Sequence, residues 1–173
     1  MIDERLDRPL IAHLAASHPE WHIIMIGPVV KVDPATLPQA PNLHYLGQRS
    51  YAVLPAYLGG WDVCLLPFAR NAATQFISPT KTLEYMAADR PIVSTPIPDV
   101  QEPYGDIVFL SAMPAEFVKA CEQALALSQE ERARRGEKMR AVLENTSWDA
   151  KAVAMQRLIQ EARTRRLPRL LAQ

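Results

Sequence analysis

A cation and a carboxylate stand three residues apart in the segment 76–99, and their types and spacing suit phosphate and sugar chemistry. Lys81 and Glu84 would share one face of a helix. Ser78 and Pro79 are favoured at the N-cap and first position of a helix, so we expect the helix to begin there. Free backbone N–H groups and the positive end of the helix dipole would then lie near Lys81 and favour an anion such as phosphate. An amphipathic helix with a surface Lys–Glu pair explains the same spacing.

Other motifs for cofactor chemistry are missing from the sequence. No G-x-G-x-x-G follows a predicted strand and there is no P-loop lysine motif, which argues against a nicotinamide-dependent dehydrogenase and a P-loop NTPase. The four histidines are scattered, and no D-x-D or other metal-ligand cluster occurs. Cys64 and Cys121 lie in apolar patterns and are interpreted as buried free thiols. We therefore predict no metal, with Lys81 and the helix N-terminus neutralising a phosphate group instead.

The composition is that of an ordinary soluble globular domain. Apolar residues make up 49% of the 173 residues and charged residues 22%, and 19 basic residues balance 19 acidic ones. A basic surface for nucleic acid is not indicated by this balance. No apolar run reaches the roughly 18 residues of a spanning helix, and the first residues are not a signal peptide, so the cytoplasm is the expected compartment.

Short apolar strands alternate with helical patterns along the chain. This alternation predicts parallel βαβ units in one Rossmann-like, three-layer α/β/α domain covering residues 1–173, with a helical part at 114–165. Pro55 should shorten or kink the second helix. The predicted strands are 22–26, 42–46, 62–66, 92–95 and 106–110, and the predicted helices are 5–17, 50–58, one from 79, 115–127, 129–145 and 148–165, with loops at 29–41 and 166–170.

Ligands of open α/β sheets bind outside the carboxyl ends of the strands. Here those ends are Gly27, Gly47, Pro67 and Thr95, so the loops that follow them should converge on the site.

The segment SPTKTLEYMAADRPIVSTPI, residues 78–97, resembles the donor-nucleotide motif of GT-B glycosyltransferases, in particular the glycosyltransferase 4 group. These proteins carry S-P-x-K-x-x-E-[YA]-[ML]-A-x-G-x-P-[VI]-[VI] in their C-terminal domain. The resemblance implies that Ser78, Pro79, Thr80, Lys81 and Glu84 bind a nucleoside-diphosphate sugar. In a complete enzyme Lys81 would stabilise the departing diphosphate, and Glu84 would accept hydrogen bonds from the ribose hydroxyls.

Two further stretches are similar to this family. Leu46-Gly47-Gln48-Arg49 with the following helix resembles its F-x-G-x-V stretch, which implies that Gly47, Gln48 and Arg49 border the nucleotide base. A plain strand-to-helix turn with a solvated Arg49 explains this stretch equally well. The strand 62–68 is similar to the family pattern A-D-[VL]-x-[LV]-x-P-[SF] and would form the floor of the site. Asn71, Thr74 and Gln75 could reach the sugar, although loop polarity also accounts for them.

The chain departs from the family pattern at two positions of the motif. Many members carry two glutamates eight positions apart, and Phe76 stands where the first would be, beside the transferred sugar. Asp89 replaces the usual glycine and is interpreted as a turn residue, because aspartate enters the left-handed region more readily than most residues.

The resemblance covers one half of a GT-B fold. The acceptor domain is absent, and the likeness begins just after the family's first strand, which typically ends in F-G. The chain is therefore interpreted as a fragment, a truncated product or half of a split enzyme. Relatives use a basic residue in the following loop to hold the diphosphate, and Arg5 is the candidate here.

The implied function is donor binding in a hexosyltransferase, such as a UDP-sugar enzyme of bacterial glycan synthesis. The partners would be a nucleotide sugar and a sugar or lipid-linked acceptor held by the missing half. The alternatives are a non-catalytic nucleotide-binding or interaction module and a GT-B-fold sugar-nucleotide epimerase. A cluster of Arg163, Arg165, Arg166 and Arg169 would permit peripheral contact with the inner face of a membrane, or it is a solvated helix end.

Overall fold

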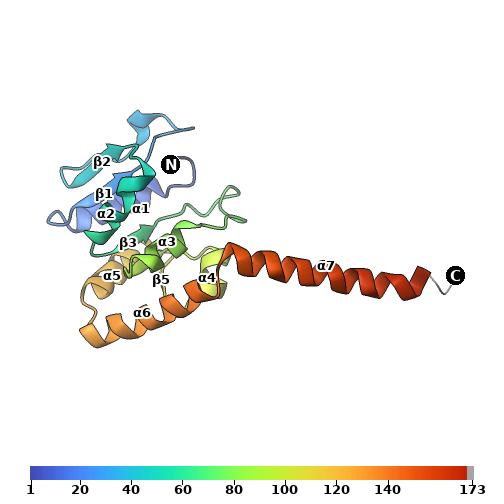
Figure 1. Cartoon of the computed structure of the whole chain (residues 1–173). Coiled ribbons are helices and arrows are strands. Elements are labelled where there is room, and N and C mark those ends of the chain that lie inside the picture. Colours follow the sequence, from blue (N-terminus) through green and yellow to red (C-terminus); the bar gives the residue numbers. More distant parts are fainter. Residues whose placement is uncertain (171–173) are drawn as a thin grey trace.

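The computed structural model describes residues 1–170, with side chains described through Thr164 (Figure 1). Strands and helices alternate along most of the chain, as predicted. The elements are α1 (Arg8–Ser17), β1 (Ile23–Ile26), the 3₁₀ turn η1 (Pro34–Thr36), β2 (Leu43–Gly47), the 3₁₀ turn η2 (Tyr51–Val53), α2 (Leu54–Gly59), β3 (Cys64–Leu66), α3 (Lys81–Ala87), β4 (Ile92–Ser94), α4 (Pro98–Tyr104), β5 (Phe109–Leu110), α5 (Pro114–Leu125), α6 (Gln129–Glu144) and α7 (Trp148–Leu170).

The strands are all parallel, and they fall into two sheets. β1 pairs with β2, with Ile23 opposite Leu43. β3 pairs with β4 and β4 with β5, giving the order β3-β4-β5. The prediction of parallel strand pairing is therefore confirmed. The strands form two sheets instead of one, and the division falls between β1 and β3.

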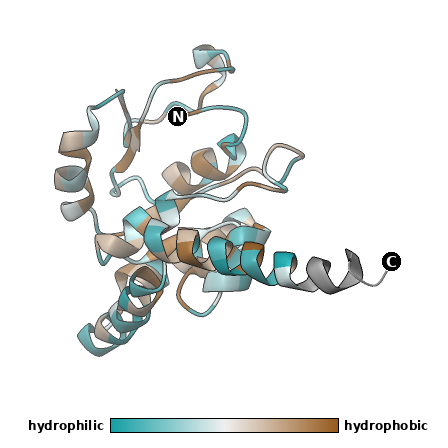
Figure 2. Ribbon diagram, turned by 45° about the vertical axis from the view of Figure 1, so that its right-hand side comes forward, coloured by the Kyte–Doolittle hydropathy of each residue, from teal (hydrophilic) through white to brown (hydrophobic). Residues whose placement is uncertain are grey.

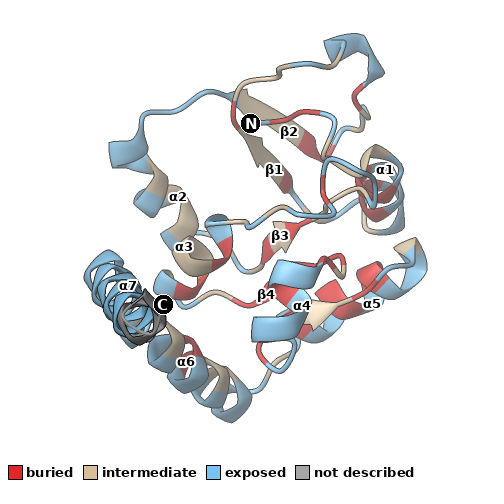
Figure 3. Ribbon diagram, turned by 90° about the vertical axis from the view of Figure 1, so that its right-hand side faces the viewer, coloured by how far each residue is buried: buried red, intermediate tan, exposed pale blue. Residues whose placement is uncertain are grey.

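Helices cover the strands from both sides. Val93 belongs to an apolar cluster formed with α1 and α5, whereas the preceding Ile92 belongs to a second cluster formed with α3, α4 and α6. Successive side chains of a strand point to opposite faces, so these two clusters lie on opposite sides of β4. This arrangement confirms the three-layer α/β/α prediction, and Figure 3 shows the buried segments gathered along the strands and the helices beside them. Phe117, at the centre of the first cluster, is fully buried.

The helices α2, α4 and α7 differ from the prediction, and α1 begins at Arg8, three residues later than predicted. The helix α4 was not expected, because Pro98 and Pro103 mark its sequence as a turn, although proline fits the first turn of a helix and Pro98 occupies that place. Pro55 likewise lies in the first turn of α2, so it starts the helix and does not kink it. The predicted irregular segment 166–170 was wrong, since α7 continues to Leu170.

The helix α7 extends away from the rest of the molecule (Figures 1 and 2). Apolar side chains on it, including Trp148, Met155 and Ile159, are exposed. None of the helices described here is both long and apolar enough to cross a bilayer. Of the arginine cluster, Arg163 is exposed, and the side chains of Arg165, Arg166 and Arg169 lie outside the described ones.

Asp89 has the left-handed backbone predicted for it, with φ of 53° in the turn after α3. A residue with a Cβ atom pays about 1–2 kcal/mol for that conformation, which glycine avoids at some cost in chain entropy. Asp89→Gly should therefore raise the free energy of unfolding by about 0.5–1 kcal/mol, because the 3.9 Å pair of Asp89 with Arg140 is exposed and contributes little. Urea unfolding would measure this change, and a loss of stability would contradict it.

His18 joins the end of α1 to the last turn of α5 through a carboxylate. Its ring stacks on Trp21 and its nitrogens bond Glu20 at 2.7 Å and Glu122 at 2.9 Å. The hydrogen bond to Glu20 contributes most to raising the pKa of His18, and the hydrogen bond to Glu122 raises it further.

A raised pKa gives a defined pH dependence. The stabilisation by His18 should be fully present below its unfolded pKa of about 6.5 and lost as pH rises through the higher folded pKa. His18→Gln should therefore lower Tm more at pH 5.5 than at pH 9. His13→Gln, at an exposed position of the same helix, is the control. Equal losses for His18→Gln at both pH values would contradict the prediction.

Candidate nucleotide-binding site

A cavity of about 620 Å³ runs along β1 and β3 and reaches their carboxyl ends. The strand ends meet in pairs, since the Gly27 N–H donates to Gly47, and Thr95 exchanges hydrogen bonds with Phe68 directly after Pro67. Of the four predicted strand ends, Pro67 lines the cavity, whereas Gly27, Gly47 and Thr95 do not. Predicted site residues from two distant segments line this cavity, namely Arg5, Ser78, Pro79, Thr80 and Lys81.

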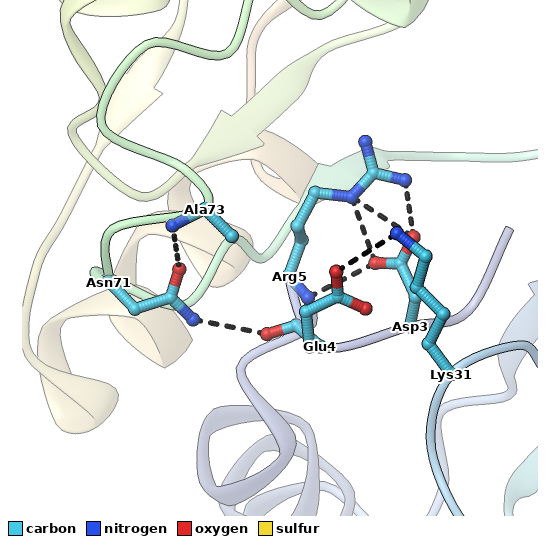
Figure 4. Close-up of polar contacts among 6 residues, drawn as sticks. All are labelled: Asp3, Glu4, Arg5, Lys31, Asn71 and Ala73. Atoms are coloured by element: carbon cyan, nitrogen blue, oxygen red, sulfur yellow. Dashed lines mark hydrogen bonds and ion pairs between the residues drawn. The ribbon is translucent and has the colours of Figure 1, made fainter.

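Arg5 is held in place by Asp3 (Figure 4). Its Nε lies 2.9 Å from Asp3 Oδ1, and its Nη2 donates to Oδ2 of the same carboxylate. Asp3 is 4% exposed, whereas the Arg5 side chain is 30% exposed. Hydrogen bonds from Arg5 lower the pKa of Asp3, so the carboxylate is ionised at neutral pH. No described residue bonds Nη1 of Arg5, which leaves one edge of the guanidinium for a ligand.

The loop carrying Arg5 is fastened to the loop that leads into α3. Asn71 Nδ2 donates to the carbonyl of Glu4 at 3.1 Å (Figure 4). The Ala69 N–H donates to the carbonyl of Arg5 at 2.8 Å. Asn71 in turn accepts from the N–H of Ala73. These bonds join the two segments that hold the cations of the site.

Lys81 projects from the first position of α3 into this cavity. The residue as a whole is exposed, and it forms part of the cavity lining. Burial lowers the pKa of Lys81, and the positive charge of Arg5 lowers it further. The negative charges of Glu84 and Asp3 act in the opposite direction. A lysine whose pKa is lowered by burial and by a neighbouring cation lies where an anion would be stabilised.

The start of α3 differs from the prediction. Ser78 caps nothing and is exposed, and α3 begins at Lys81 after Thr80, which makes no side-chain cap. The N–H of Thr82 bonds Pro79 and that of Leu83 bonds Thr80, so the chain enters the helix through a tight 3₁₀-type turn. The predicted serine cap was therefore wrong, although Ser78 still lines the cavity.

Several predicted residues lie away from this cavity. Gly47, with φ of 68°, ends β2, and the exposed Gln48 and Arg49 follow it. None of the three lines the cavity. Arg49 instead contacts the Tyr57 hydroxyl at 3.3 Å and the Gln48 carbonyl. Glu84 is half-buried on α3, outside the lining.

The loop between β3 and α3 contains both buried and exposed side chains. Thr74 is buried and bonds the carbonyls of Ala69 and Asn71, so it stabilises the loop and does not face a ligand. Phe76 is 86% exposed, Gln75 beside it is also exposed, and neither lines the cavity. Thr74 therefore stabilises the loop between β3 and α3.

Asp3 is the residue of this site that sequence analysis missed. A single acidic residue in a charged segment, Asp3-Glu4-Arg5, carries no spacing that separates a buried carboxylate from a solvated one. The apolar Ile2 and Leu6 on either side, both of which line the cavity, were the available signal that the segment runs inside the fold.

Comparisons with known proteins agree with this fold. The family model described as "Glycosyl transferases group 1" matches residues 8–127. A Bacillus subtilis (strain 168) protein named as the teichuronic acid biosynthesis glycosyltransferase TuaH is 28% identical over 136 residues, which are 75% of this chain and 34% of that protein. The chain thus spans about a third of the length of this relative.

Solved structures share the fold at low sequence identity. The N-terminal domain of Candida albicans trehalose-6-phosphate phosphatase has a TM-score of 0.70 at 16% identity, covering 92% of this chain and 40% of that one. A UDP-forming α,α-trehalose-phosphate synthase of Burkholderia vietnamiensis has a TM-score of 0.63 at 20% identity, with 94% and 44% covered. The match of the family model to most of the chain favours a transferase over the epimerase and non-catalytic alternatives. This chain belongs to the group 1 glycosyl transferase family and has the α/β fold of a GT-B domain.

Proposed function

We propose that the domain binds the nucleoside-diphosphate sugar of a glycosyltransferase, with the diphosphate between Arg5 and Lys81. The observation that carries this proposal is that the two cations, 76 positions apart in sequence, line one cavity that reaches the carboxyl ends of β1 and β3. Ser78, Pro79 and Thr80 line the same cavity and add polar groups.

The chemistry of this site is electrostatic. When the sugar leaves, negative charge grows on the departing diphosphate, and fixed cations in a cavity stabilise that charge without reorganising. Lys81 would meet the charge as a point cation, whereas Arg5 would offer the edge that Asp3 leaves open. Among the described residues no three His, Cys, Asp or Glu side chains gather to hold a metal ion. We propose metal-independent transfer, with Glu84 on the ribose hydroxyls and Gly47, Gln48 and Arg49 near the base.

The remaining parts of the activity would come from elsewhere in the complete protein. The chain spans about a third of its Bacillus subtilis relative, whose name assigns it to teichuronic acid synthesis. We propose that a second, acceptor-binding half completes the enzyme, that the donor is a UDP sugar, and that the product is a bacterial glycan. A lipid-linked acceptor would bring the domain to the cytoplasmic face of the membrane.

Calorimetric titration of the folded chain with UDP, GDP and TDP tests the donor proposal. We expect binding of at least one diphosphate, and weaker binding of the matching nucleoside, because the cations contact phosphate. Lys119→Ala, on the exposed side of α5, should bind like the unaltered chain. Failure of all three diphosphates to bind a chain with native circular dichroism would contradict the proposal.

A further inference from the structure

Two of the four histidines meet across the β1–β2 pair, although they are 22 positions apart in the sequence. His22 directly precedes β1, and His44 is the second residue of β2. His22 Nδ1 lies 3.0 Å from His44 Nε2. The ring centroids are 5.2 Å apart, with 39° between the ring planes. The two rings therefore approach each other through their nitrogens and do not stack.

The pairing of β1 with β2 holds both rings on one face of the sheet (Figure 1). Ile24 lies opposite His44 in the parallel register, and His22 is two residues before Ile24. Because side chains two residues apart on an extended segment share a face, His22 and His44 project from the same side. The opposite face carries Ile23 and Leu43, which are buried in one cluster with α1 and α5. The backbone that carries the two rings is therefore fixed by core packing.

The facing nitrogens can hold either a shared proton or a cation. A neutral imidazole carries its proton on one ring nitrogen and a lone pair on the other, and the proton can occupy either position. In one arrangement, one ring donates a hydrogen bond to the other. With the proton of His22 on Nε2 and that of His44 on Nδ1, both facing nitrogens present lone pairs. A metal ion can then take the place of the shared proton, and neutral imidazole is the commonest metal ligand in proteins.

The separation of the two nitrogens indicates the kind of ion. Imidazole nitrogens lie about 2.0–2.1 Å from a bound divalent transition metal ion, so nitrogens 3.0 Å apart would subtend an angle of roughly 90–100° at the ion. In a tetrahedral site the nitrogens would be about 3.3–3.4 Å apart, whereas neighbouring ligands of a tetragonal ion are about 2.9 Å apart. Cu²⁺ and Ni²⁺ take tetragonal sites with nitrogen ligands. The pair therefore suits Cu²⁺ or Ni²⁺ better than Zn²⁺.

The pair is open to solvent on the side away from the core. His22 is exposed and His44 is half-buried. Within the part of the chain whose side chains are described, no third His, Cys, Asp or Glu joins them in a group of three. Water would therefore fill the remaining positions around an ion. The chain from His22 to Gly27 spans about 16 Å, so the pair lies at the opposite end of β1 from the proposed diphosphate site.

We propose that His22 and His44 together bind a divalent transition metal ion of the Cu²⁺ or Ni²⁺ type. The ion joins the amino ends of β1 and β2 and takes no part in sugar transfer. Affinity of nitrogen ligands rises along the first-row metals to copper, so Cu²⁺ binds more tightly than Ni²⁺. Because unfolding separates the two strands, an ion that needs both rings stabilises the folded chain. The inference is independent of the proposed nucleotide ligand.

Calorimetric titration of the folded chain, without a histidine tag, with NiCl₂ and with CuCl₂ tests the pair. We expect one ion to bind per pair of rings. His22→Gln and His44→Gln should each weaken Ni²⁺ binding by at least about tenfold, because the remaining ring loses the effective concentration of its neighbour. His13→Gln removes an exposed histidine of α1 outside the pair and should bind Ni²⁺ like the unaltered chain.

Thermal unfolding and electron paramagnetic resonance give two further readouts. At a free Ni²⁺ concentration ten times Kd, Tm should rise by roughly 3–6 °C, and removal of the ion with EDTA should reverse the rise. The same Ni²⁺ concentration should leave Tm of His44→Gln nearly unchanged. The resonance spectrum of the Cu²⁺ complex should show two equivalent nitrogens in the unaltered chain and one in His44→Gln.

Three outcomes would overturn the proposal. One is that neither ion binds a chain with native circular dichroism. Another is an unchanged Ni²⁺ affinity in both His22→Gln and His44→Gln. The third is an equal loss of affinity in His13→Gln, which would place the ion at another part of the surface.

Discussion

Lys81→Ala should weaken binding of UDP by roughly 10- to 100-fold while leaving uridine binding nearly unchanged. A hydrogen bond to a charged group is worth about 1.5–3 kcal/mol, and 1.4 kcal/mol corresponds to a tenfold change in Kd. Lys81 lines the cavity beside Arg5, so its ammonium would meet the diphosphate and not the base. Calorimetry on the same preparation measures both ligands.

The pH dependence gives an independent check on Lys81. Burial lowers its pKa, so its charge is lost at lower pH than that of an ordinary lysine. UDP affinity should therefore fall as pH rises through this lowered pKa, and Lys81→Ala should show no such fall. Lys119→Ala is the matched control. Equal losses for UDP and uridine in Lys81→Ala would contradict the phosphate role, even if the protein binds UDP.

Asp3→Asn should lower the free energy of unfolding by about 1–3 kcal/mol at pH 7, because the Arg5 guanidinium would lose a buried charged acceptor. Arg5 is partly exposed, and solvent keeps the loss below that of a fully buried pair. Arg5→Met and the double variant complete a cycle of urea unfolding curves, which measures the coupling of the two side chains. Additive losses would show that the pair contributes nothing beyond its separate parts.

The sign of the pH effect follows from the lowered pKa of Asp3. The stabilisation is present above the unfolded pKa of about 3.9 and is lost as pH falls through the lower folded pKa. Asp3→Asn should therefore be less stable than the unaltered chain at pH 7 and approach it near pH 2. Asp33→Asn, which caps an exposed 3₁₀ turn, serves as the carboxylate control.

Local patterns predicted most of the fold because they follow from local chemistry. The apolar runs at Ile23–Ile26 and Ile92–Ser94 became strands, and the capping box at Ser128 marks the start of α6. The helix α4 was missed because proline occurs both in turns and at the first position of a helix. Only the packing of Val100 in the core favours the helix over the turn. The division of the sheet depends on contacts between distant segments, which no local pattern encodes.

The site was predicted to the extent that its residues follow a motif. Ser78–Lys81 were found by their spacing and Arg5 by resemblance, and all of them line the cavity. Asp3 could not be found in this way, because its role comes from burial, and burial is set by the strands around it. The contacts of Glu84 and Arg49 with a ribose and a base stay predictions.

The projection of α7 has a practical consequence for any assay of this protein. The helix extends away from the rest of the molecule, whereas Met1 and Ile2 line the same cavity as Arg5 and Lys81. An affinity tag joined directly to Met1 would therefore stand beside the two cations and change the affinity for phosphate being measured. A purification tag therefore belongs at the other end, beyond the projecting α7, where it is remote from the cavity.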